Sequence, residues 1–244
     1  MVLKEGVIMK FDNSHQLVIN DIKLNYHENG QGDVLVFIHG NRLSSGTFIN
    51  LYDYFSDRYK VVAMDNRGYG SSECGEVPYS IDLFADDIIT FCSKKKFTNI
   101  CLIGYSDGAN IALMIAKKYP ELIHKLVIIS GNYKVDGIKK WLRNIFKVLI
   151  SLLMPFTKYF NPIKIQKWKL DLMLNDMDIS EIDLNRIMKP TLMLYAEYEF
   201  VYEEHTLDMH KNIKDSVLKV IKKTNHSNII FNKKIIKIID EFLN

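Results

Sequence analysis

The alternation of short apolar runs with longer amphipathic stretches constrains the fold of this chain most. Six apolar runs have the length and β-branched character of strands buried on both faces, at 34–39, 61–64, 100–103, 126–129, 191–195 and 217–221. Stretches with helical periodicity lie among them, at 44–55, 81–95, 107–119, 202–211 and 228–243. This pattern predicts an α/β fold: a mostly parallel, doubly wound sheet with helices on both faces.

Two further runs, 7–10 and 22–27, are expected to form an antiparallel pair near the N-terminus. They bring the expected sheet to about eight strands, a size common in single α/β domains.

One segment interrupts the alternation of strands and helices. Between residues 132 and 188 no strand-like run occurs, and 138–154 has polar residues at the three- and four-residue spacing of a helix. Pro155 and Pro162 then break the chain. We therefore expect 132–188 to be a helical cap insertion over the C-terminal edge of the sheet. Residues 1–131 and 189–244 would form the core domain.

The composition excludes several classes of protein. The 32 Lys and Arg residues nearly balance the 29 Asp and Glu residues, and only five of the 32 are arginines. Because a nucleic-acid-binding surface is usually strongly basic and rich in arginine, no nucleic acid partner is expected. Three cysteines without a CxxC pair argue against a disulfide framework or a zinc site. Lys4, Glu5 and Lys10 interrupt any signal-peptide core, and no apolar run approaches the ~18 residues that span a bilayer. We expect a cytoplasmic protein.

The strongest functional signal is the sequence Gly104-Tyr105-Ser106-Asp107-Gly108, which follows a predicted strand directly and precedes a predicted helix. A G-x-S-x-G nucleophile elbow needs this setting. A sharp turn from strand to helix exposes the serine hydroxyl at the sheet edge, and the helix N-terminus behind it favours developing negative charge. Ser106 is therefore the candidate nucleophile.

Together with three other motifs in the same order, this elbow resembles the α/β-hydrolase family over nearly the whole chain. The first motif is His39-Gly40-Asn41, at the end of a predicted strand. The resemblance implies that the backbone N–H groups of Asn41 and Asp107 form an oxyanion hole. For the His39 imidazole we expect a structural role in shaping the turn.

The second motif, 65–72, resembles the D-x-R-G-x-G-x-S loop of the family. Its expected role is structural: the glycines allow backbone turns, and Asp65 and Arg67 hold the loop through hydrogen bonds. The adjacent pair Asp86 and Asp87 is expected on a solvated surface, because neighbouring helical residues do not face one site.

The third motif is the elbow, and the fourth is Asn225-His226-Ser227, between the last predicted strand and helix, where the family has its catalytic histidine. The acid departs from the family's usual G-x-x-D pattern, since Ala196 and Glu199 stand at its two fixed positions. Glutamate serves as the acid in some α/β-hydrolases, so we assign Glu199. Glu197 is the main alternative, and an acid near Asp136 is a third.

The resemblance implies a serine hydrolase with the triad Ser106, His226 and Glu199, a metal- and cofactor-free enzyme. The expected substrate is a small carboxylic ester, thioester or related carbonyl compound, cleaved through an acyl-enzyme. Two alternatives remain. One is a C–C bond hydrolase of the same fold, and the other is a non-catalytic ligand-binding member in which Glu199 is a degraded acid.

The aromatic and aliphatic residues of the expected cap suit a small-molecule substrate with an apolar acyl or aryl group. We expect Tyr105 and Trp141 to contact this substrate, although the apolar residues of the cap would equally serve to pack it on the core. The lysines at 139, 140, 147, 158, 164, 167 and 169 make this region basic. A basic amphipathic helix can lie on an anionic membrane, but we favour an exposed helix with solvated lysines.

Overall fold

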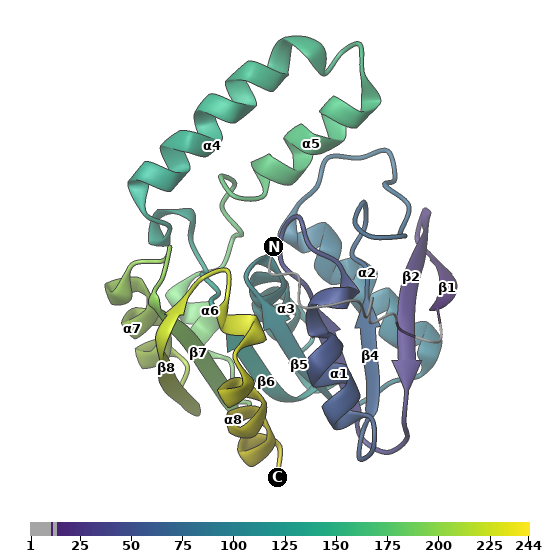
Figure 1. Cartoon of the computed structure of the whole chain (residues 1–244), viewed down its shortest axis with the longest axis vertical. Helices are drawn as coiled ribbons and strands as arrows, with labels where there is room; N and C mark the ends of the chain where they lie inside the picture. The colour runs from purple at the N-terminus through teal and green to yellow at the C-terminus, as the bar shows by residue number, and fades with distance from the viewer. Residues whose placement is uncertain (1–10, 12–13) are drawn as a thin grey trace, which may run out of the picture.

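A computed structural model describes residue 11 and residues 14–244, and in it eight strands form one sheet in the order β1-β2-β4-β3-β5-β6-β7-β8 (Figure 1). The strands are β1 (Ser14–Ile19), β2 (Ile22–Asn29), β3 (Val34–Ile38), β4 (Lys60–Met64), β5 (Ile100–Tyr105), β6 (Ile123–Ile129), β7 (Thr191–Tyr198) and β8 (Ser216–Asn225). β2 pairs antiparallel with β1 and β4, and the other pairs are parallel. The predicted α/β fold with a mostly parallel sheet is confirmed.

Helices cover both faces of the sheet. α1 (Ile49–Phe55) and α8 (Lys233–Leu243) cover one face, in front of the sheet in Figure 1, whereas α2 (Ile81–Lys95), α3 (Asp107–Lys118) and α7 (Glu203–Asn212) cover the other. In β3, Leu35 and Phe37 join the core under α1 and α8, and Val36 and Ile38 join the opposite core. Because both strand faces are buried, the strand sequence is continuously apolar.

The N-terminal edge differs from the prediction. The expected strand at 7–10 lies outside the described residues. On its outer side β2 pairs with β1, a strand that the sequence did not predict. Its side chains from Ser14 to Gln16 are exposed and Ile19 is buried, so this edge strand carries little of the apolar signal that marks the central strands.

The segment 132–188 contains two helices that project from the sheet, α4 (Lys140–Leu153) and α5 (Asn161–Asp171), joined through the short helix η4 (Met154–Phe156) (Figure 1). After α5 the chain returns to the core, where the side chains of Leu172, Met177, Ile179, Leu184 and Ile187 are buried. The projecting part is thus shorter than the segment expected as a cap. Over the described residues, no helix has the length and apolar character that crossing a bilayer requires.

The 65–72 loop is held by buried charges, as expected for Asp65 and Arg67. The Asp65 carboxylate accepts hydrogen bonds from the backbone N–H of Ser45 at 2.8 Å and of Ser71 at 2.9 Å. The Arg67 guanidinium is buried and donates to both oxygens of Asp87, each at 2.8 Å. It also donates twice to the more exposed Asp21.

The prediction of a solvated surface was therefore wrong for Asp87, whose side chain is 2% exposed. Consecutive helical residues point about 100° apart, so the two acids of the pair face different surroundings. Asp86 turns outward and pairs with Lys118, whereas Asp87 turns toward the loop and pairs with Arg67.

We expect Arg67→Met to lower the free energy of unfolding by about 3–5 kcal/mol, because it leaves the Asp87 charge buried without its partner. Urea denaturation followed by circular dichroism measures this change. The matched control is Arg58→Met, which breaks the pair with Asp240; the Arg58 side chain is 43% exposed. Its expected cost is much smaller, because an exposed ion pair stabilises little. Equal losses in the two variants would contradict a stabilising role for the buried cluster.

Candidate active site

The turn between β5 and α3 has the geometry of a nucleophile elbow. Ser106 occupies it with φ 55° and ψ −123°, a strained backbone conformation for a residue other than glycine. A Cβ on Gly104 would lie 2.3 Å from the carbonyl oxygen of Gly108, and a Cβ on Gly108 would lie 1.9 Å from that of Ile38. Both flanking positions therefore require glycine, because the helix packs directly against the strands.

Three predicted side chains meet at the C-terminal edge of the sheet. Ser106 Oγ lies 3.0 Å from His226 Nε2, and His226 Nδ1 is hydrogen bonded to Glu199 Oε1. Glu199 follows the end of β7, and its side chain is 7% exposed. With Nδ1–H donating to the carboxylate, Nε2 is free to accept the serine proton. The residues come from three different strand ends, as parallel topology dictates.

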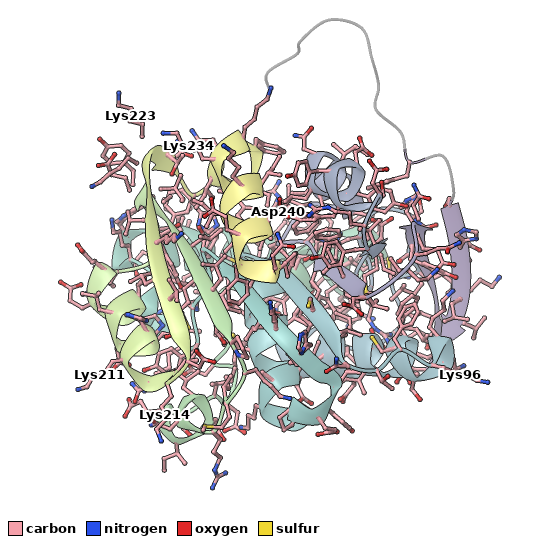
Figure 2. The ribbon with its side chains drawn as sticks, turned by 90° about the horizontal axis from the view of Figure 1, so that it is seen from below. Lys96, Lys211, Lys214, Lys223, Lys234 and Asp240 are labelled. Atoms are coloured by element: carbon pink, nitrogen blue, oxygen red, sulfur yellow. The ribbon has the colours of Figure 1, made fainter. Side chains whose placement is uncertain are left out.

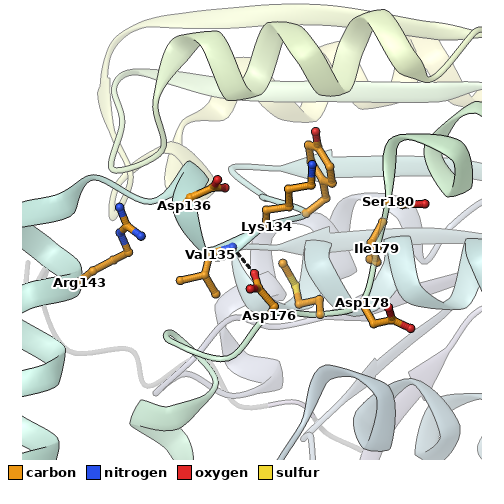
Figure 3. Close-up of a pocket in the computed structure, with 10 residues that line it drawn as sticks. Lys134, Val135, Asp136, Arg143, Asp176, Asp178, Ile179 and Ser180 are labelled. Atoms are coloured by element: carbon orange, nitrogen blue, oxygen red, sulfur yellow. Dashed lines mark hydrogen bonds between the residues drawn. The ribbon is translucent and has the colours of Figure 1, made fainter.

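The two alternative acids lie elsewhere. Glu197 accepts a hydrogen bond from the backbone N–H of Lys223 at 2.8 Å and pairs with Lys222 at 3.2 Å. These contacts, of which the backbone hydrogen bond has the largest effect, hold the pKa of its partly exposed carboxyl below the usual range. Asp136 is exposed and lines a separate pocket of about 360 Å³ with Lys134 and Arg143 (Figure 3). Glu199 is thus the acid in contact with His226.

His39 shapes the turn after β3. Its buried imidazole donates from Nδ1 to the Gly40 carbonyl at 2.8 Å and accepts at Nε2 from the Asn66 backbone N–H at 2.9 Å. Burial lowers the pKa of this imidazole to about 4, which keeps it neutral. A Cβ on Gly40 would lie 2.8 Å from the Cβ of Ser106, so this turn abuts the candidate nucleophile.

The side chain of Asn41 ties this turn to the elbow. Its Nδ2 donates to Asp107 Oδ2 at 3.0 Å and to the Lys169 carbonyl at 2.6 Å. Burial raises the pKa of the Asp107 carboxyl to about 6, an effect that the Asn41 hydrogen bond opposes. Asp107 begins α3, so its backbone N–H has no acceptor within the helix. The structure therefore brings Asn41 and Asp107, the expected oxyanion residues, together beside Ser106.

Aromatic residues surround His226. The Tyr105 hydroxyl donates to the His226 carbonyl at 2.5 Å, and its ring is buried. Tyr105 therefore supports the histidine loop from the core side, a different place from the expected substrate contact. Phe200 stacks on the imidazole with ring centroids 5.0 Å apart, and Trp141, which is 52% exposed, packs edge-on against Phe200. The position of Phe200 beside His226 could not be predicted, because nothing in the local sequence pattern marks this residue.

The residues that the structure describes contain no group of three His, Cys, Asp or Glu side chains arranged as metal ligands would be. The chemistry available at this edge is that of a hydroxyl, an imidazole, a carboxylate and backbone N–H groups.

Comparison with known proteins shows which of them this chain is similar to. A model of the alpha/beta hydrolase fold matches residues 33–151. The chain is 29% identical over 253 residues to human serine hydrolase BPHL, which covers 94% of this chain and 86% of that protein. It is 35% identical over 117 residues to 2-(acetamidomethylene)succinate hydrolase of Mesorhizobium japonicum, which covers 48% of this chain and 42% of that enzyme.

Solved structures agree on the fold. MGS-M2, an alpha/beta hydrolase from a Medee basin deep-sea metagenome library, superposes with a TM-score of 0.81 at 17% identity, covering 94% of this chain and 97% of its own. At such identity the likeness concerns the fold alone. Taken with the sequence matches, it shows that the chain has the α/β-hydrolase fold and is a hydrolase similar to the members of that family.

Proposed function

We propose that this hydrolase is an esterase-like enzyme that cleaves a small carboxylic ester, thioester or related carbonyl compound, with Ser106, His226 and Glu199 as its catalytic triad. The observation that carries the proposal is the unbroken chain of contacts from Ser106 Oγ through both imidazole nitrogens to Glu199. A serine hydroxyl is a weak nucleophile by itself, and such a chain activates it.

The proposed reaction has two halves. Ser106 Oγ attacks the substrate carbonyl carbon while His226 Nε2 takes its proton, and Glu199 stabilises the resulting imidazolium. The backbone N–H groups of Asn41 and Asp107 stabilise the oxyanion that forms on the carbonyl oxygen. The intermediate expels the alcohol or thiol, which takes the proton from His226. Water then attacks the acyl-enzyme by the same steps, releasing the acid and restoring the Ser106 hydroxyl.

We also propose that α4 and α5 act as the cap that selects the substrate. One face of α4 keeps large apolar side chains exposed at helical spacing: Trp141, Ile145, Val148, Leu149 and Leu152. Packing on the core would bury such a face, so its exposure supports a role in receiving an apolar acyl or aryl group. The Phe200 ring links Trp141 to His226 and brings this face to the site.

The other possibilities have less support. A non-catalytic member of the fold has no need for a buried Glu199 bonded to His226. A C–C bond hydrolase would use the same three side chains, and no contact in the site favours it over ester cleavage. The cytoplasmic location and the absence of a nucleic acid partner stay predictions.

Two measurements on the wild-type protein test the proposed function. A fluorophosphonate probe is expected to label it, and p-nitrophenyl esters are expected to be hydrolysed with kcat/KM rising about tenfold from acetate to butyrate. The estimate follows from two added methylenes at up to ~0.8 kcal/mol each. Equal rates at all chain lengths would contradict the apolar cap, and failure of both labelling and hydrolysis would contradict the esterase itself.

A further inference from the structure

We propose that Arg42 and Lys169 bind a carboxylate carried by the substrate, so that the preferred substrate is an ester whose acyl chain ends in an anionic group. This inference rests on the proposed function and adds the chemical class of its substrate. It starts from a pocket beside the oxyanion turn that combines an aliphatic wall with two cations.

The pocket lies between the projecting helices and the turn after β3. Its volume is about 340 Å³, and it is lined by Arg42, Leu149, Leu152, Leu153, Gln166, Lys169 and Leu170. Arg42 directly follows Asn41, and the Lys169 carbonyl accepts a hydrogen bond from the Asn41 side chain at 2.6 Å. Gly40 abuts Ser106 and lies two residues before Arg42, so the same turn contacts the nucleophile and lines the pocket.

Among the residues that the structure describes, no acidic side chain pairs with either cation of this pocket. Within the described part of the chain, neither Arg42 nor Lys169 has a carboxylate oxygen within the 4.0 Å of an ion pair. Lys169 Nζ lies 4.2 Å from the centroid of the Tyr69 ring. Burial, together with repulsion from Arg42, lowers the pKa of the Lys169 amine. A bound anion would relieve this repulsion and supply the missing partner.

The surrounding segment strengthens the positive field. Residues 137–170 contain seven lysines and one arginine but none of the chain's 29 acidic residues. Charge of one sign around a cleft raises the local concentration of ligands of the opposite sign and speeds their association. The hairpin of α4 and α5 therefore favours an anionic over a neutral substrate.

The two parts of the pocket define the ligand. Leucine side chains of α4 and α5 suit the methylenes of an acyl chain, and an arginine suits a carboxylate, to which it can donate two hydrogen bonds. Because the cations flank the oxyanion turn, the carboxylate would lie at the far end of a chain whose scissile carbonyl faces Ser106. A dicarboxylic acid esterified at one end has this form.

A matched pair of esters tests the inference. We expect kcat/KM for the mono-p-nitrophenyl ester of adipic acid to exceed that of p-nitrophenyl hexanoate, of equal chain length, by about tenfold at low salt. The ratio should fall as salt is added, because ions screen a partly exposed charge. In Arg42→Gln/Lys169→Gln the ratio should fall to about one. The matched control, Lys211→Gln/Lys214→Gln, removes the same charge at the exposed surface seen in Figure 2 and should keep the wild-type ratio.

The outcomes separate this inference from the proposed function. Hydrolysis of the hexanoate ester with a wild-type ratio near one overturns the anion site and leaves the esterase standing. Failure to hydrolyse either ester overturns both. A ratio that persists in the double variant overturns the assignment to Arg42 and Lys169. A measurement on the wild type needs no variant: free adipate should inhibit hexanoate ester hydrolysis and 1,6-hexanediol should not, whereas equal inhibition would contradict the inference.

Discussion

Replacing Ser106 with alanine is expected to lower kcat for p-nitrophenyl butyrate by about 10⁴-fold or more and to abolish fluorophosphonate labelling. The substitution removes the Oγ that lies 3.0 Å from His226 Nε2, and loss of a triad serine leaves only the catalysis provided by binding and the oxyanion hole. Alanine has a Cβ as serine does, so the backbone strain of the elbow is the same in the variant. Thermal unfolding should therefore show a folded protein.

The matched control for this substitution is Ser227→Ala. Ser227 is exposed and directly follows His226 in the chain, so its loss tests whether any serine near the site gives the same effect. It should leave labelling and kcat within about twofold of wild type. Labelling that persists in Ser106→Ala, or disappears in Ser227→Ala, would refute Ser106 as the nucleophile.

The core of the fold was predictable because its signal is local and repeated. Strands β3 to β7 each contain a run that is buried on both faces, so each has a continuous apolar stretch that stands out from the helices between them. β1 was not predicted, because it is an exposed edge strand whose first residues are polar, so it lacks a continuous apolar run. α4 was predicted from its periodicity, but its projection with an exposed apolar face reverses the usual rule that such faces are buried.

The candidate site divides in the same way. Ser106 was predictable because strand, turn and helix follow one another within a few residues, and His226 because it occupies the turn before the last helix. Asn41 contacts Asp107, which lies 66 positions later in the chain, and Lys169, which lies 128 positions later. No local sequence pattern predicts contacts over such separations. The burial of Asp87 likewise depends on Arg67, 20 residues earlier in the chain.

Glu199→Gln is expected to lower kcat by about 10³–10⁴-fold while binding of substrate changes little. The amide still fills the site, but it carries no charge to stabilise the imidazolium, and its nitrogen favours the wrong tautomer of His226. Glu197→Gln is the matched control, because Glu197 lies two residues away, pairs with Lys222 and accepts a hydrogen bond from the backbone N–H of Lys223. It should leave kcat within about twofold of wild type.

A readout beyond loss of activity separates a catalytic carboxylate from a structural one. In Glu199→Ala, added formate should restore part of kcat, because a small carboxylate can occupy the space left by the side chain and accept the Nδ1–H of His226. Chloride at equal ionic strength should have no such effect. If Glu197→Gln rather than Glu199→Gln abolished turnover, the acid role would move to Glu197. Rescue of Glu199→Ala by chloride as well as by formate would show that ionic strength, and not a carboxylate at this position, limits the variant.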